Sequence, residues 1–120
     1  MLTFEATRAA EVIDLSKGLS LHDLSLSAAF HKQHDPSAMF HALVELSDLG
    51  LISWSRETDY GNTLGQTGND LREDIAWIQS SGFDPKVDIT PPFRTLFIES
   101  SIALKYALDQ AIEVYGSLLQ

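Results

Sequence analysis

The hydrophobic pattern changes its period at Gly50, and this change constrains the fold more than any other feature of the chain. Before Gly50, apolar residues recur in three stretches at the three- and four-residue spacing of amphipathic helices. After it, residues 51–56 alternate in part between apolar and polar, as a strand does, and residues 58–62 have the composition of a turn. Residues 63–64 suit a short return strand. The sequence therefore predicts three helices followed by an antiparallel hairpin.

Capping residues set the boundaries of these predicted helices. Ser20 and Asp35 are good N-cap residues, and Pro36 suits the first position of a helix. Gly18 and Gly50 are helix stops, because glycine readily takes the left-handed conformation that ends a helix. The predicted helices cover residues 3–17, 20–34 and 35–49. The core positions predicted for the third helix are Met39, Leu43, Leu46 and Leu49.

Two further helices are predicted in the second half of the chain. Residues 66–80 have helical spacing, and residues 82–90 have the character of a connecting loop. Thr90 is a good cap for a last helix that begins at Pro91 and could run to Leu118, about 40 Å at 1.5 Å per residue. The inward positions predicted for the fourth helix are Leu71, Ile75 and Ile78.

Two motifs flank the predicted hairpin. Residues 42–52 read Ala-Leu-Val-Glu-Leu-Ser-Asp-Leu-Gly-Leu-Ile, and residues 64–71 read Leu-Gly-Gln-Thr-Gly-Asn-Asp-Leu. They resemble the end of the third helix and the wing exit of winged helix-turn-helix proteins. The resemblance implies a mainly α fold with a small β-hairpin wing and a long C-terminal helix. It divides the chain into a winged domain over 1–82, and a linker with a dimerisation helix over 83–120 that packs on the same domain.

With a final helix after the wing, the layout is similar to that of bacterial regulators of the PadR and MarR kind. That resemblance implies a small cytoplasmic transcription regulator that acts as a homodimer and places its third helix in a major groove. The positions expected to be exposed on this helix are Ser37, Ala38, His41, Ala42, Glu45 and Asp48, none of which is Lys or Arg. The candidate nucleic-acid contacts are Lys32, Gln33, Ser37, His41 and Arg56.

The charge balance opposes this function. The 120 residues include 17 acidic and 8 basic side chains, for a net charge of −9, whereas phosphate contacts need Lys and Arg. The alternative is an acidic winged-helix module that binds protein and does not bind DNA. Mimicry of DNA by the acidic face is a weaker version of that alternative, because the carboxylates are spread along the chain and not gathered in runs.

The last predicted helix is apolar on most of its sides, so something must cover it on most sides. A twofold homodimer is the simplest cover, and the alternative is a central helix wrapped entirely by its own chain. The predicted dimer residues, several of them repeating every seven positions, are Phe97, Leu104, Leu108, Ala111, Ile112, Tyr115 and Leu118.

Other chemistry is sparse in the sequence. It contains neither a Gly-rich phosphate loop followed by Lys nor a Gly-x-Ser-x-Gly elbow, so we expect no enzyme and no cofactor. The chain has no cysteine, which excludes disulfides and thiol catalysis. Its apolar runs are shorter than the roughly 18–20 residues that span a bilayer, and residues 1–12 lack the pattern of a signal peptide. We therefore expect a cytoplasmic protein with no membrane partner.

Two remaining clusters have both a functional and an ordinary interpretation. His31, His34 and His41 crowd one region and could suit zinc, but exposed polar residues are the simpler interpretation, so we predict no metal. Three aromatic residues could line a small-molecule pocket between the hairpin domain and the last helix, or could simply be core. These pocket candidates are Trp54, Trp77 and Phe93.

Overall fold

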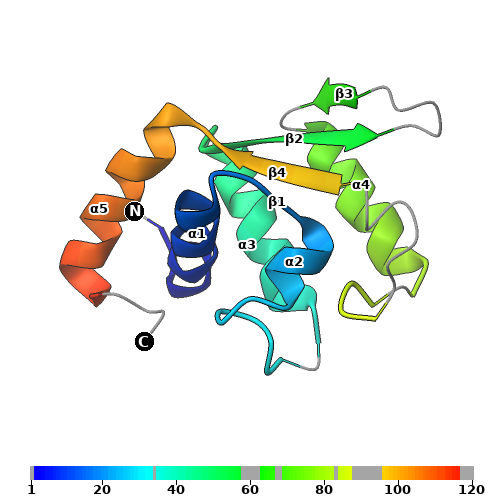
Figure 1. The fold of residues 1–120 in the computed structure, drawn as a ribbon, viewed down its shortest axis with the longest axis horizontal. Helices are drawn as coiled ribbons and strands as arrows, with labels where there is room; N and C mark the ends of the chain where they lie inside the picture. The colour runs from blue at the N-terminus through cyan, green and yellow to red at the C-terminus, as the bar shows by residue number, and fades with distance from the viewer. Residues whose placement is uncertain are drawn as a thin grey trace.

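The computed structural model describes residues 2–33, 35–57, 63–66, 69–82, 84–87 and 96–116, without the side chains of 55–57, 63–66, 69–70 and 77. Within these ranges the chain forms five helices and a four-stranded antiparallel sheet (Figure 1). The helices are α1 Phe4–Ser16, α2 Leu21–Ser25, α3 Ser37–Asp48, α4 Asn69–Ser80 and α5 Ile102–Tyr115. The strands are β1 Leu19–Ser20, β2 Ile52–Glu57, β3 Thr63–Gln66 and β4 Leu96–Ser100. The predicted mainly helical fold with a β-hairpin is confirmed.

Helix α1 forms where it was predicted because its caps and its buried face agree. The Thr3 hydroxyl accepts a hydrogen bond from the backbone N–H of Ala6 at 3.3 Å. At the other end, Lys17 takes the left-handed conformation and its N–H donates to the Ile13 carbonyl at 3.0 Å. The buried face includes the small residues Ala6, Ala9 and Ala10, which let other helices approach closely, and α1 packs against both α3 and α5.

Helix α2 is much shorter than the predicted helix over 20–34. Its start is as predicted, because the Ser20 hydroxyl accepts a hydrogen bond from the N–H of Asp23 at 3.1 Å. The helix ends at Ser25, whose hydroxyl donates to the His22 carbonyl, and the next turn has the same kind of contact from Ser27. Such side chain to backbone bonds compete with helix propagation. Residues 26–32 therefore form turns and not a second half of the helix.

The position of helix α3 agrees with the prediction, but the prediction of its buried and exposed residues is only partly correct. Met39, Leu43 and Leu46 are buried as predicted. Ala42 was predicted to be exposed, which is wrong: it is buried in the hydrophobic core, in a helix that packs on both α1 and α4.

The core position expected of Leu49 is also wrong. Leu49 follows the last turn of α3 and is exposed, while Leu51 is buried. Gly50 has a φ of 71°, and this left-handed residue turns the chain so that the Leu51 N–H donates to the Leu46 carbonyl at 2.9 Å.

The first part of the last predicted helix is in fact a strand. β4 lies between β1 and β2 in the sheet order β1-β4-β2-β3, and α5 begins only at Ile102. Leu96 and Ile98 are buried while Phe97 and Glu99 are exposed, which is the period-two pattern of a strand with one covered face. Residues 91–95 of the predicted helix lie outside the described residues.

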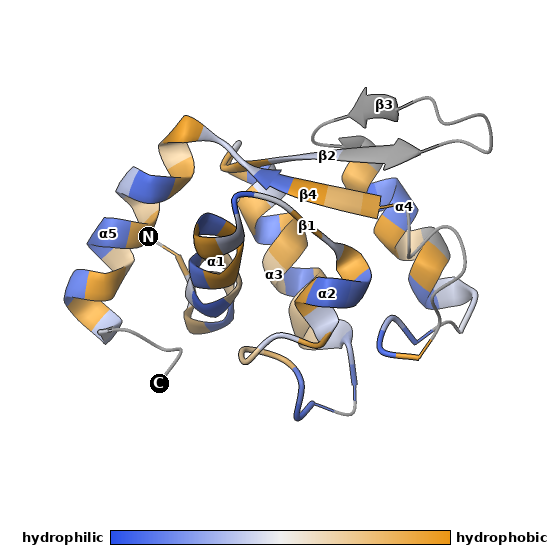
Figure 2. Cartoon of the chain, viewed as in Figure 1, coloured by the Kyte–Doolittle hydropathy of each residue, from blue (hydrophilic) through white to orange (hydrophobic). Residues whose placement is uncertain are grey.

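The sheet joins the two predicted parts of the chain. β4 comes from the part predicted as a linker and helix, yet it pairs with β1 and β2 of the predicted winged domain, so both parts share one sheet. β2 pairs with β3 as the predicted hairpin, and α4 buries its three predicted inward residues. In Figure 2 hydrophobic residues are prominent on α1, α3 and the start of β4, while α5, beside α1, alternates in hydropathy along its length.

Candidate interaction surfaces

The outer surface of α3 is where the resemblance predicts DNA contact. On α3 itself, His41 is exposed and Ser37 is half-buried; in the loop before α3, Lys32 is exposed and Gln33 is half-buried. The side chain of Arg56 lies outside the described residues. α1 packs on one side of α3 and α4 on the other (Figure 1), and only His41 and Asp48 of α3 are exposed.

A carboxylate occupies the N-terminal end of α3. Asp35 accepts hydrogen bonds from the backbone N–H of Ser37 at 2.9 Å and from its hydroxyl at 2.8 Å. These bonds hold the pKa of the Asp35 carboxyl below its usual value of 3.8, and His41 adds a smaller effect in the same direction. Asp35 is therefore ionised at neutral pH, at a helix end that otherwise favours anions such as phosphate.

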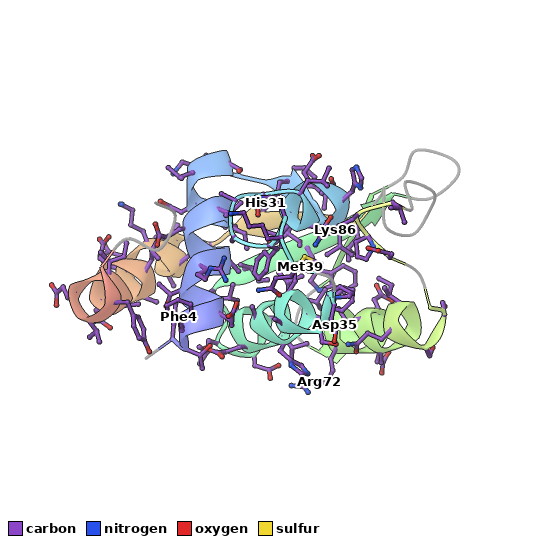
Figure 3. The ribbon with its side chains drawn as sticks, turned by 90° about the horizontal axis from the view of Figure 1, so that it is seen from below. Phe4, His31, Asp35, Met39, Arg72 and Lys86 are labelled. Carbon is purple, nitrogen blue, oxygen red and sulfur yellow. The ribbon has the colours of Figure 1, made fainter. Side chains whose placement is uncertain are left out.

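Two more acids on α3 contact other parts of the same chain. The Glu45 carboxylate accepts hydrogen bonds from the Thr3 backbone N–H at 2.9 Å and from the Thr3 hydroxyl at 2.8 Å, at the start of α1. Asp48 forms an ion pair with Arg72 of α4, which lies along the outer edge of α3 and α4 in Figure 3. Arg72 is exposed, but this pairing partly neutralises the cation that lies beside α3.

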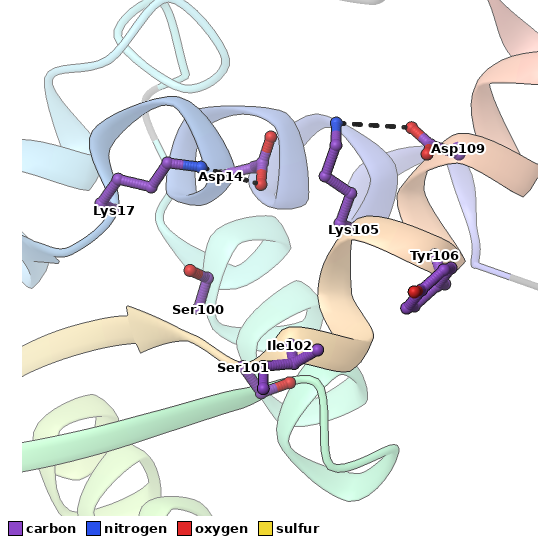
Figure 4. Close-up of a pocket in the computed structure, with 8 residues that line it drawn as sticks. All are labelled: Asp14, Lys17, Ser100, Ser101, Ile102, Lys105, Tyr106 and Asp109. Carbon is purple, nitrogen blue, oxygen red and sulfur yellow. Dashed lines mark ion pairs between the residues drawn. The ribbon is translucent and has the colours of Figure 1, made fainter.

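A second surface is the groove between α1 and α5, which we call the α1–α5 groove. It consists of two depressions of about 500 and 280 Å³ that share Asp14, Lys105 and Asp109. The wider one lies where the end of α1 meets the start of α5 (Figure 4). The other residues that line the groove are Glu11, Leu15, Lys17, Ser100, Ser101, Ile102, Tyr106, Leu108 and Ile112.

The charges of the α1–α5 groove are balanced in pairs. On the α1 side, the Nζ of Lys17 lies 3.6 Å from the Oδ1 of Asp14. On the α5 side, the Nζ of Lys105 lies 3.8 Å from the Oδ1 of Asp109, and both side chains are well exposed (Figure 4). Glu11 is buried at the edge of the groove. This near-neutral face contrasts with the net charge of −9 on the whole chain.

Large apolar side chains lie open to solvent on both sides of the groove. Ile102 is 88% exposed and Tyr106 is 72% exposed on α5, and Leu15 is 73% exposed on α1. Isolated exposed apolar residues are common, but apolar side chains that line one depression mark a surface suited to contact. The sequence alone does not single out Ile102, because the last predicted helix is apolar on most of its sides.

The dimer residues predicted from the sequence mostly point elsewhere. Leu104, Leu108 and Ala111 are buried in the core that α5 shares with α1. The prediction that these three residues form a dimer interface is therefore wrong. Phe97 belongs to β4, and its ring lies against Gly18. Ile112 and Tyr115 are partly buried against the same core, and Leu118 lies outside the described residues.

The remaining sequence candidates fall in the core or outside the described parts. Trp54 is buried on β2, and its indole N–H has no hydrogen-bond partner among the described residues. The side chain of Trp77 and all of Phe93 lie outside them, so the predicted ligand pocket stays a prediction. The same holds for the histidine cluster through His34. Among described residues, His, Asp and Glu form no group of three or more that could hold a metal ion.

No protein-family model matches the chain, and neither a curated protein nor a solved structure matches it. Within the described residues, none of the helices is long and apolar enough to cross a membrane.

Proposed function

We propose that this chain is a small winged-helix-type protein that acts by contacting protein through the α1–α5 groove, and that its α3 does not bind DNA. The order of elements supports the winged-helix part of the proposal. α1, β1, α2, α3 and β2 follow one another, and β4 then returns between β1 and β2. β3 and α4 are an addition between the neighbouring strands β2 and β4.

The ionised Asp35 at the N-terminal end of α3 is the observation that carries the functional part. Recognition helices approach DNA with their N-terminal residues. Here that end presents a carboxylate, and the exposed face of α3 adds Asp48. A DNA phosphate would meet repulsion at the position where it needs a cation. The α1–α5 groove has balanced charge and exposed apolar groups, which suits contact with protein.

Fluorescence anisotropy with labelled mixed-sequence duplex DNA tests this proposal. At about 50 mM salt, where phosphate contacts are strong, we expect no saturable binding by the natural chain. The matched variants Lys32→Ala and His41→Ala should then give the same flat titration. Saturable binding that weakens in either variant would contradict the proposal.

Such a result would instead favour the homodimeric transcription regulator. One observation gives that second candidate some basis, because basic groups gather at the loop before α3. Lys32 is exposed. The Nζ of Lys86 donates to the His31 carbonyl at 3.3 Å, and Figure 3 labels Lys86 and His31. These cations are the phosphate contacts that a DNA-binding form of the protein would use.

A further inference from the structure

The outward face of α5 has an arrangement of charge that fits a copy of itself. Lys105 and Asp109 are four residues apart, so they lie on the same face of the helix one turn apart. When two such helices pack antiparallel through this face, about a twofold axis level with Ala107, the order of charges reverses between them. Each lysine then lies opposite the partner's aspartate, so both contacts are attractive.

Apolar residues of the same face match in this register. An axis level with Ala107 places Ile102 at the same height along the helix pair as the partner's Ile112. Leu108 packs in the core of its own chain and is only 3% exposed. Ile102 is exposed, and Ile112 is half-buried and lines the narrower depression. These side chains supply the apolar area that drives association, while the charges fix direction and register.

The net charge of the chain narrows the choice of surface. Two molecules with a charge of −9 repel each other, so they associate best where the local charge is balanced and opposite signs can meet. The α1–α5 groove meets this condition, because its two lysines lie beside two aspartates. By contrast, α3 and the residues just before it carry the exposed Asp35 and Asp48 and the half-buried Glu45, while the cation Arg72, which pairs with Asp48, lies on the neighbouring α4.

We propose that the partner at the α1–α5 groove is a second copy of this chain, bound through antiparallel α5 helices in which Lys105 of each copy pairs with Asp109 of the other. This inference rests on the proposed use of the groove for protein contact, and adds the identity and the orientation of the partner. The contact is isologous, so one surface serves both copies.

Charge reversal tests the orientation and the register together. Lys105→Asp alone places two aspartates opposite each other, and Asp109→Lys alone places two lysines opposite each other. Each single variant should raise the dimer dissociation constant by at least about tenfold, and the double variant K105D/D109K should restore it to within about threefold. Lys32→Asp is the matched control, because it reverses a charge on an exposed loop and should leave the constant unchanged.

A mixture of the two single variants gives the sharpest outcome. In a pair of K105D with D109K, each aspartate of one chain lies opposite a lysine of the other, so the mixture should form a heterodimer at a concentration at which each variant alone is mostly monomeric. Sedimentation velocity reports both results, since the chain mass is 13.3 kDa and a dimer has twice that. Circular dichroism checks that every variant is folded.

A natural chain that stays at 13.3 kDa at its highest soluble concentration would overturn the inference. A dimer that neither single reversal weakens, or single variants that fail to associate when mixed, would overturn the antiparallel register. These results can be told apart from a failure of the proposed function. The proposed function fails if the DNA titration is positive, whether the protein is a monomer or a dimer.

Discussion

α3 and α5 both have an outer face that could bind a partner, but other parts of the same chain contact much more of α3 than of α5. α1 and α4 pack on α3, Asp35 binds its first backbone N–H, and Glu45 and Asp48 contact Thr3 and Arg72. α5 packs mainly on α1 and keeps Ile102 and Tyr106 exposed. The position of a helix in the fold therefore decides what it can bind, because a helix packed between others has few unpaired groups left.

The largest effect should separate the two sides of α5. Leu104→Ala removes a fully buried side chain and should lower the free energy of unfolding by about 2–5 kcal/mol. Ile102→Ala removes a side chain that is 88% exposed and should change it by less than about 0.5 kcal/mol. Urea unfolding of both variants in dilute solution measures the difference. Equal losses would mean that α5 does not pack on α1 by the face described.

A smaller effect tests whether Phe97 belongs to the sheet and not to a dimer. A Cβ on Gly18 would lie 2.8 Å from the Cε1 of Phe97, and the φ of Gly18 is 156°. Gly18→Ala should therefore lower the free energy of unfolding by about 1–3 kcal/mol. In a Phe97→Ala background the same change should cost less, because the ring is gone. A loss of the same size in both backgrounds would mean that the Phe97 ring does not limit the space at Gly18.

A third pair of variants tests how much the acidic residues of α3 stabilise the fold. Glu45→Ala removes both hydrogen bonds to Thr3 at the start of α1 and should cost about 1 kcal/mol in the free energy of unfolding. Asp48→Ala breaks an exposed ion pair with Arg72 and should cost less than that, about 0.5 kcal/mol. The ratio of the two losses in urea unfolding is the readout. A larger loss for Asp48→Ala would contradict the assignment of Glu45 as the main contact.

The smallest effect concerns pH. The pKa of Asp35 is lowered in the folded chain, so its ionised form stabilises the fold above the unfolded pKa, and this contribution is lost as pH falls through the folded pKa. Asp35→Asn keeps a side-chain acceptor but removes the charge. The natural chain should be slightly more stable than this variant at pH 7, and the gap in urea midpoint should close at acidic pH below the usual value of 3.8. A gap that widens in acid would reverse the sign of the effect.

Local patterns in the sequence predicted most of the fold. The alanine face of α1, the Ser20 cap, the Asp35-Pro36 start and the change of period at Gly50 each predict an element that the structure contains. These signals are local, because a cap or a change of period depends only on neighbouring residues.

What the sequence could not give depends on contacts between distant residues. β4 was hidden because Phe97 and Leu104 happen to fit a seven-residue repeat, although Leu96 and Ile98 alternate with polar or exposed neighbours. A five-residue strand has too few positions to separate the two periods, and its partners β1 and β2 lie far away in sequence.

The site shows the same division. Periodicity indicated that α5 is apolar on several sides, but only its packing on α1 decides which side is free. That packing buries Leu104 and leaves Ile102 exposed. Likewise, the scarcity of Lys and Arg on the third helix was visible in the sequence, whereas the bonds of Glu45 to Thr3 were not.

The absence of cysteine allows one measurement to compare the two helices directly. Tyr106→Cys and His41→Cys each introduce a single thiol at an exposed position, the first on α5 near the proposed axis and the second on α3. Under mild oxidation at equal concentration, non-reducing electrophoresis should show a disulfide-linked dimer for Tyr106→Cys and mostly monomer for His41→Cys. A dimer that forms faster through His41→Cys, or at equal rates in both, would contradict the claim that α5 and not α3 is the contact surface.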